Sequence, residues 1–181
     1  MVVKITENFY QLTDVFTVKL FDQLVRIFEQ EDKRNWACIT DAGTDVLRLQ
    51  HSLSVNEELG QLINRELRPI VSLAEPQVGQ LYQNGPQLWY DNDGYINTIH
   101  NGDVSPNHCV NVQVYLSNGD ERMGTCCYDE GAWHSVPYRA NAGYMLIGPT
   151  RIPHGMRYPV TGHRISLYQG FRNTEVPSDI W

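Results

Sequence analysis

The feature that most constrains the fold is a strict alternation of residue types over residues 109–116. The even positions hold valine or leucine, whereas the odd positions hold Cys109, Asn111, Gln113 and Tyr115. Since successive side chains of a β-strand point to opposite faces, this run predicts a strand with one apolar and one polar face. The apolar face needs a cover, and the polar face is typical of a strand that lines the interior of a small barrel.

Short strand-like runs of this kind fill the chain from about residue 80 onward. Runs at 124–130, 143–148 and 163–171 are separated by stretches rich in glycine, asparagine and proline. Another pair of runs flanks the turn signal Asp-Asn-Asp-Gly at 91–94, which predicts a β-hairpin there. Many short antiparallel strands following helices indicate an α+β, mostly β fold with a barrel or jelly roll.

Two apolar stripes at helical spacing precede these strands. The first includes Leu20 and Leu24 and predicts a helix over about residues 14–30, beginning at Thr13 or Asp14. We expect its apolar side to pack on the sheet.

The second stripe predicts a helix over about residues 55–72. Ser54 and Glu57 form a capping box at its start, and Pro69 is expected to end or kink it. Neither stripe carries a cofactor-binding motif, so both helices are interpreted as support for the strand-rich half.

Length and composition indicate one domain over residues 1–181. The chain is 19% charged and 41% hydrophobic, which argues against disorder. We expect residues 1–80 to form a helical support with short strands near 1–5, 36–40 and 46–50. Residues 81–171 are expected to form the β core and 172–181 a tail.

Charge and cysteine content narrow the possible partners. A net charge of −7 argues against a basic nucleic-acid-binding face. No run approaches the roughly 18 apolar residues of a membrane span, and the charged N-terminal residues lack the apolar core of a secretory signal. The four cysteines show no CxxC spacing, so we expect reduced thiols and a cytoplasmic location. The oligomeric state is open.

A small set of residues carries the chemistry. His100 is followed by Asp103, and His154 stands before an Arg-x-Ser triplet formed by Arg164 and Ser166. Two histidines and one carboxylate that face a common point form the facial triad of non-haem Fe(II) oxygenases. An arginine beside such a metal offers a planar fork of donors to a carboxylate.

The alternation of the last strand places Arg164, Ser166 and Tyr168 on one face. If that face is the interior, an unpaired guanidinium there is costly, and a carboxylate ligand would relieve the cost.

These residues and their surroundings resemble the Fe(II)- and 2-oxoglutarate-dependent dioxygenase superfamily, and most of all its prolyl-hydroxylase-like branch. The resemblance covers about residues 87–171 and is carried by WYDNDGYINTIHNGD, VQVYLSNGD, MGT and PHGMRYPVTGHRIS. It implies a double-stranded β-helix (jelly roll) with the N-terminal helices on the outer face of one sheet.

The resemblance also implies a site and an activity. The implied residues are His100, Asp103 and His154 for Fe(II), and Arg164, Ser166, Tyr115 and Tyr90 for 2-oxoglutarate. With O2 as second co-substrate, such an enzyme hydroxylates a small molecule or a peptide side chain and releases succinate and carbon dioxide. Variable loops near 40–55 and 128–141, with Trp133 and Tyr138, are candidates for the substrate side.

The chain departs from the family pattern at the iron carboxylate. The pattern is His-x-Asp, but Gly102 occupies the second position after His100 and Asp103 comes one later. A bulge at the glycine would bring Asp103 back into place. The alternatives are another acid, such as Asp91 or Asp93, or no carboxylate at all, as in the halogenases of this superfamily.

A rival interpretation is a catalytically silent or cupin-like metal-binding β-helix domain. Residues 143–154 resemble the second cupin motif, in which glycine and proline precede a histidine. The first cupin motif requires His-x-His, which does not occur in this sequence, and the Arg-x-Ser triplet has no role in a plain cupin.

Overall fold

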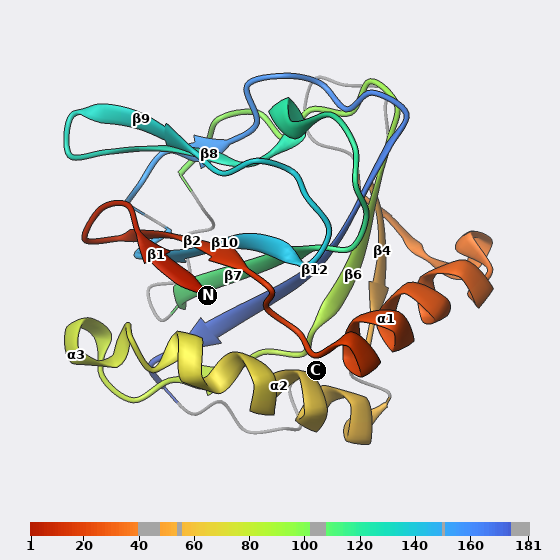
Figure 1. Ribbon diagram of the computed structural model, residues 1–181, viewed down its shortest axis with the longest axis horizontal. Helices are drawn as coiled ribbons and strands as arrows, with labels where there is room; N and C mark the ends of the chain where they lie inside the picture. The colour runs from red at the N-terminus through yellow and green to blue at the C-terminus, as the bar shows by residue number, and fades with distance from the viewer. Residues whose placement is uncertain (40–47, 54–55, 102–107, 150, 175–181) are drawn as a thin grey trace.

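Two antiparallel sheets face each other, and helices cover the outer side of the larger sheet (Figure 1). The computed structural model describes residues 1–39, 48–53, 56–101, 108–149 and 151–174. In Figure 1 the helices lie below the large sheet, and the small sheet lies above it. This arrangement confirms the expected mostly β fold with its helices on the outside.

The large sheet is built from segments that lie far apart in the sequence. In spatial order its described strands are β1 (Val2–Lys4), β2 (Phe9–Thr13), β10 (Ala142–Ile147), β7 (His108–Tyr115), β12 (His163–Arg172), β6 (Gln87–Asn92), β4 (Arg48–Ser52) and β3 (Ala37–Ile39), with β5 (Tyr82–Gln83) paired to β12. The described strands of the small sheet are β11 (His154–Gly155), β8 (Cys126–Asp129) and β9 (Ala132–Ser135).

The first helix, α1 (Val18–Gln30), begins later than the sequence predicts. Its N-cap is Thr17, whose side chain accepts a backbone hydrogen bond of the first turn. The predicted caps cannot start the helix, because Thr13 belongs to a strand and Asp14 has a left-handed φ of 51°. Part of the stretch that the periodicity alone assigns to the helix therefore belongs to strand β2 and to the connection that follows it.

The second helix, α2 (Glu57–Val71), is capped by Asn56. The predicted capping residue Ser54 lies outside the described residues. Pro69 does not end the helix, which continues to Val71. The hydrogen bond that proline cannot donate is a single one, to the carbonyl four residues earlier. The short helix α3 (Glu75–Val78) follows.

Two single turns of 3-10 helix stand in the connections. They are η1 (Lys33–Asn35) and η2 (Glu121–Met123). Among the described residues, no helix combines the length and the apolar character that crossing a membrane requires.

The main hydrophobic core lies between the large sheet and the helices. The valines of β7 face it, as the alternation predicts. Its members include Val110, Val112, Val114, Leu88, Ile165 and Leu167 from the sheet and Leu20, Leu24, Leu59, Ile63 and Leu67 from α1 and α2. The helices thus bury the apolar face of the sheet and leave its polar face to the interior between the two sheets.

A second core, rich in aromatic residues, fills the space between the two sheets. Its buried members are Phe9, Tyr95, Tyr115, Met123, Cys127, Val136, Tyr138, Tyr144, Leu146, Ile152, Met156 and Val160. This cluster holds the small sheet over the polar face of the large one.

The predicted hairpin around residues 91–94 is wrong. Strand β6 pairs with β12 and β4 instead of with the residues that follow the turn. After the turn, Tyr95 is buried between the sheets, and the chain crosses to the small sheet, where His100 bridges to His154. The turn residues reverse the chain direction after β6. The chain then places Tyr95 in the core between the sheets and continues to the small sheet.

Candidate functional site

The two histidines singled out in the sequence lie side by side. His100 and His154 form an isolated antiparallel bridge. The amide of His100 donates to the carbonyl of His154 at 3.0 Å, and the amide of His154 donates back at 2.8 Å. Their ring centroids are 4.7 Å apart. Residues more than fifty positions apart in the chain are therefore brought together by backbone pairing.

Both imidazole rings are oriented in the same way by the backbone. Nδ1 of His100 lies 2.7 Å from the carbonyl oxygen of Thr98, and Nδ1 of His154 lies 2.8 Å from that of Ile152. An Nδ1–H that donates to a carbonyl places the ring lone pair on Nε2, as in most metal-binding histidines. The pair therefore fits a metal ion.

The carboxylate of the predicted triad lies outside the described residues, since Asp103 falls in the 102–107 gap. Within the described ranges, no group of three or more His, Cys, Asp or Glu side chains is placed to hold a metal ion. The alternative acids are engaged elsewhere. Asp93 accepts a hydrogen bond from the amide of Gly162 at 2.7 Å, and Asp91 is bound to two arginines.

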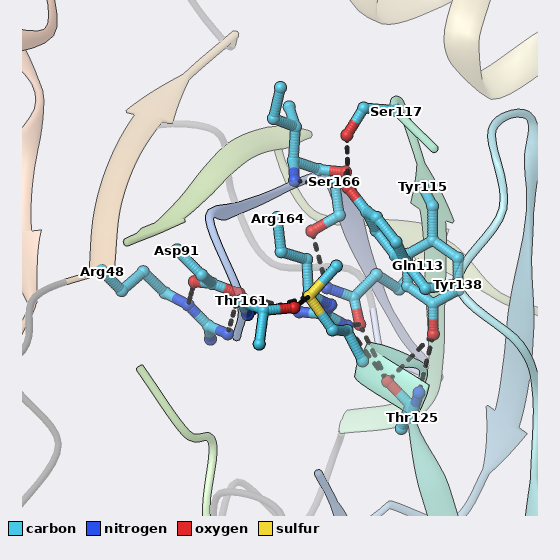
Figure 2. A network of polar contacts seen from close by, with 12 residues as sticks. Arg48, Asp91, Gln113, Tyr115, Ser117, Thr125, Tyr138, Thr161, Arg164 and Ser166 are labelled. Carbon is cyan, nitrogen blue, oxygen red and sulfur yellow. Dashed lines mark hydrogen bonds and ion pairs between the residues drawn. The ribbon is translucent and has the colours of Figure 1, made fainter. Parts of the chain in front are cut away.

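Arg164 is buried at the centre of a polar network on the inner face of the large sheet (Figure 2). Its Nη1 lies 2.8 Å from Oδ2 of Asp91. Its Nη2 donates to Oε1 of Gln113 and to Oγ1 of Thr125, both at 3.3 Å. Its Nε is buried and has no hydrogen-bond partner among the described residues.

A second arginine, which the sequence did not single out, shares the same carboxylate. Arg48 donates from Nε to Oδ1 of Asp91 at 2.6 Å and from Nη2 to Oδ2 at 3.1 Å. Its guanidinium carbon lies 4.1 Å from the ring centroid of Trp89 and 4.7 Å from that of Tyr95. The signal available in the sequence was that Arg48 stands between two leucines in the strand expected near 46–50, which predicts that it faces the opposite side from them.

The cluster of Arg48, Asp91 and Arg164 has a net charge of +1, because two guanidinium groups share one carboxylate. The side chains are only 7%, 0% and 1% exposed, respectively. Burial opposes the charge of Arg164, but the pKa of its guanidinium is nevertheless raised by the neighbouring Tyr115 and the Asp91 carboxylate. A buried excess cation of this kind is favourable to an incoming carboxylate.

Tyr115 and Ser166 lie beside this cluster, as the alternation of their strands predicts. The two residues are direct neighbours across β7 and β12. Oγ of Ser166 accepts a hydrogen bond from Nε2 of Gln113 at 2.7 Å, and the hydroxyl of Tyr115 accepts one from the amide of Thr125 at 2.9 Å. The Tyr115 ring centroid is 5.1 Å from the guanidinium carbon of Arg164.

Of the two aromatic residues proposed for the substrate side, Tyr138 is inside and Trp133 is outside. The hydroxyl of Tyr138 accepts a hydrogen bond from the amide of Ile165 at 2.9 Å, and burial raises its pKa. Trp133 is 42% exposed and packs against Tyr128 on the β8–β9 hairpin. Tyr138 thus belongs to the wall beside Arg164 (Figure 2).

The structure does not bring Tyr90 to this cluster. Tyr90 lies opposite Ile165, on the side of the sheet that the helices cover, and its ring is 5.5 Å from that of Phe28 in α1. Because neighbouring residues of a strand face opposite ways, the inward position belongs to Asp91 instead.

All four cysteines lie in described parts of the chain and form no disulfide. Cys127 faces the interior with His154, to which it is paired across β8 and β11. Burial, with a smaller contribution from Asp129 and Cys126, raises the pKa of Cys127 to about 12. A thiol in that state is protonated at neutral pH and is not a nucleophile.

Comparison with known proteins gives matches at the level of structure. No protein-family model matches this sequence. No curated protein matches it either.

Several solved structures share the fold. A prolyl-4-hydroxylase from Pseudomonas putida is 14% identical, with a TM-score of 0.72 over 94% of this chain and 95% of its own. A Trichoplax adhaerens prolyl hydroxylase, solved with a peptide of hypoxia inducible factor, is 13% identical, with a TM-score of 0.71 over 93% of this chain and 84% of its own.

HygX from Streptomyces hygroscopicus, solved with nickel, 2-oxoglutarate and hygromycin B, is 15% identical, with a TM-score of 0.66 over 92% of this chain and 83% of its own. At these identities the likeness is one of fold. The chain therefore has the double-stranded β-helix fold of the 2-oxoglutarate- and Fe(II)-dependent oxygenases, which confirms the predicted fold class.

Proposed function

We propose that this protein is an Fe(II)- and 2-oxoglutarate-dependent dioxygenase that hydroxylates a small molecule or a peptide side chain. The observation that carries the proposal is the buried excess charge around Arg164, which lies on the inner face of the same fold that pairs His100 with His154. The fold of the solved oxygenases supports it.

In this proposal, Nε2 of His100 and of His154 bind Fe(II), and Asp103 is the third ligand. Fe(II) bound there would supply the chemistry that couples conversion of 2-oxoglutarate and O2 to succinate and carbon dioxide with hydroxylation of the substrate. The protein supplies two imidazoles whose orientation is already set by the carbonyl groups of Thr98 and Ile152.

Arg164 holds the distal carboxylate of 2-oxoglutarate, and Ser166 and Tyr115 are its hydrogen-bonding neighbours. The unpartnered Nε of Arg164 and the polar atoms around it form a site that is arranged before the ligand arrives. Similar solved structures contain a peptide in one case and hygromycin B in another, which supports both substrate classes.

The test is an anaerobic titration of the purified protein with Fe(II) and 2-oxoglutarate, followed by the visible charge-transfer band of the chelate. The band is expected in the wild type and should be absent in His154→Ala. In Arg164→Met the apparent affinity for 2-oxoglutarate should be at least about a hundredfold weaker, because the buried ion pair between Arg164 and the distal carboxylate is lost. His163→Ala removes an exposed histidine beside Arg164 and serves as the matched control.

Circular dichroism of each variant separates loss of the ligand from loss of the fold. A folded wild-type protein without the band would overturn the proposal and favour the silent β-helix domain. The variants Asp103→Ala and Asp93→Ala are compared to identify the third ligand. Loss of the band in Asp103→Ala alone supports Asp103 as the iron carboxylate.

A further inference from the structure

We propose that Arg48 is a positioning residue that keeps Arg164 available to the co-substrate. By binding both oxygens of Asp91, Arg48 prevents this carboxylate from neutralising Arg164. The inference rests on the proposed function, and it assigns a role to a residue of a supporting strand, outside the core of the β-helix.

The three side chains meet because of strand register. Asp91 of β6 lies directly opposite Arg164 of β12 on one side and directly opposite Arg48 of β4 on the other. All three therefore point to the inner face of the sheet. The carboxylate stands between two guanidinium groups in a place that is almost closed to water.

The carboxylate is shared unequally between the two arginines. Arg48 contacts both oxygens of Asp91, at 2.6 Å and 3.1 Å, in a forked geometry. Arg164 contacts only Oδ2, through Nη1, at 2.8 Å. The other nitrogens of Arg164 face neutral oxygens at 3.3 Å or no partner at all in the described structure.

Arg48 is itself fixed in place by aromatic rings. Its guanidinium carbon lies over the rings of Trp89 and Tyr95, at 4.1 Å and 4.7 Å from their centroids. Cation–π contacts with two rings hold the plane of the guanidinium so that its edge faces Asp91. The fork of Arg48 is therefore a built feature of the fold.

The charge balance explains why this matters for a ligand. Two buried cations and one buried anion leave one positive charge, and the distal carboxylate of 2-oxoglutarate brings the total to neutral. Without Arg48, Asp91 and Arg164 balance each other, and the incoming carboxylate would meet a neutral pair. Burying an unbalanced anion is costly, so affinity for the co-substrate falls.

The test is a set of variants that removes Arg48 and then its partner. Dissociation constants for 2-oxoglutarate are measured by anaerobic titration of the Fe(II) protein and by protection against thermal unfolding with Mn(II). Pyruvate is measured beside it, because it has the keto-acid end but no distal carboxylate. Arg139→Gln, which removes an exposed arginine paired with Glu121, is the control.

Arg48→Gln is expected to weaken 2-oxoglutarate binding by at least about tenfold, which corresponds to about 1.4 kcal/mol, and to leave pyruvate binding unchanged. The double variant Arg48→Gln/Asp91→Asn is expected to recover affinity for 2-oxoglutarate, because the competing carboxylate is gone. Arg48→Lys keeps the charge but loses the fork and should be intermediate.

Unchanged 2-oxoglutarate affinity in Arg48→Gln would overturn the inference. So would a double variant that binds 2-oxoglutarate more weakly than Arg48→Gln, because the losses of affinity add when both residues have a merely structural role. If Arg48→Gln does not fold, Arg48→Lys with and without Asp91→Asn carries the same comparison. A folded wild type that binds no 2-oxoglutarate would overturn the proposed function as well.

Discussion

The two faces of the large sheet both carry buried side chains in its central strands, but they are covered in opposite ways. The outer face presents valine, leucine and isoleucine to α1 and α2. The inner face presents Arg48, Asp91, Gln113, Arg164 and Ser166, joined by ion pairs and hydrogen bonds. On the outer face stability comes from apolar area removed from water, whereas on the inner face each polar group needs a partner.

This difference teaches where function lies in a fold of this kind. A buried ionic network contributes little to stability compared with apolar packing of the same volume. Its presence inside a sheet that the helices already stabilise is the observation on which the proposed ligand site rests. Substitutions on the two faces should accordingly differ in what they damage.

The largest expected effect is on the outer face. Leu167→Ala removes a fully buried side chain between the sheet and the helices, and the free energy of unfolding should fall by about 2–5 kcal/mol. Urea unfolding measures the loss. At a temperature where the variant is folded, its 2-oxoglutarate affinity should match the wild type, and a weakened affinity would break the distinction between the faces.

The neighbouring residue on the same strand gives the matched inner-face test. Ser166→Ala leaves Nε2 of Gln113 without its acceptor, which should cost about 1–3 kcal/mol of stability. Here co-substrate affinity should fall as well, by several-fold, in the Fe(II) titration. Retained affinity with lost stability would mean that Ser166 serves the fold alone.

A substitution at the N-cap of α2 should destabilise the helices on the outer face by a smaller amount. Asn56→Ala removes the side chain that accepts a hydrogen bond from the amide of Leu59 at 3.0 Å. Loss of an N-cap of this type costs about 0.5–2 kcal/mol. Thermal unfolding should register the change while ligand affinity stays constant. Asn173 is exposed and lies outside every helix, so Asn173→Ala serves as the comparison.

The smallest expected effect is a loss of stability at alkaline pH that is caused by Cys127, which is buried between the two sheets. Because burial raises the pKa of Cys127 to about 12, the folded state favours the neutral thiol. This contribution is complete below the ordinary thiol pKa of about 8.5 and is lost as the pH rises toward 12. Urea unfolding at pH 7.5 and pH ~9 should therefore show a steeper loss in the wild type than in Cys127→Ala. The exposed Cys38→Ala should behave like the wild type, and equal slopes in all three proteins would contradict the assignment.

Much of this architecture follows from local pattern. The alternation over residues 109–116 predicts which side of β7 the helices cover, and Val110, Val112 and Val114 lie in the core with α1 and α2. The same logic places Arg164 and Ser166 together on the inner face. Period-2 and period-3.6 patterns are reliable here because each records one buried side.

Other features escape local pattern. The turn at 91–94 predicts a hairpin, but β6 pairs with β4, which precedes it by more than thirty residues, and with β12, which follows it by about seventy. Tyr90 resembles a family tyrosine, yet the phase of β6 turns Asp91 inward instead. A one-residue difference in phase reverses the face, and phase is set by pairing with distant strands.

The sequence by itself determined the types of element and the sidedness of the strands, and it singled out most of the residues that we propose for iron and 2-oxoglutarate. Those properties depend on the spacing of residues within one segment. Only the tertiary structure decided that His100 meets His154 and that Arg48 and Arg164 share Asp91. These contacts join segments more than forty residues apart, and long-range strand register, which no local spacing records, brings them together.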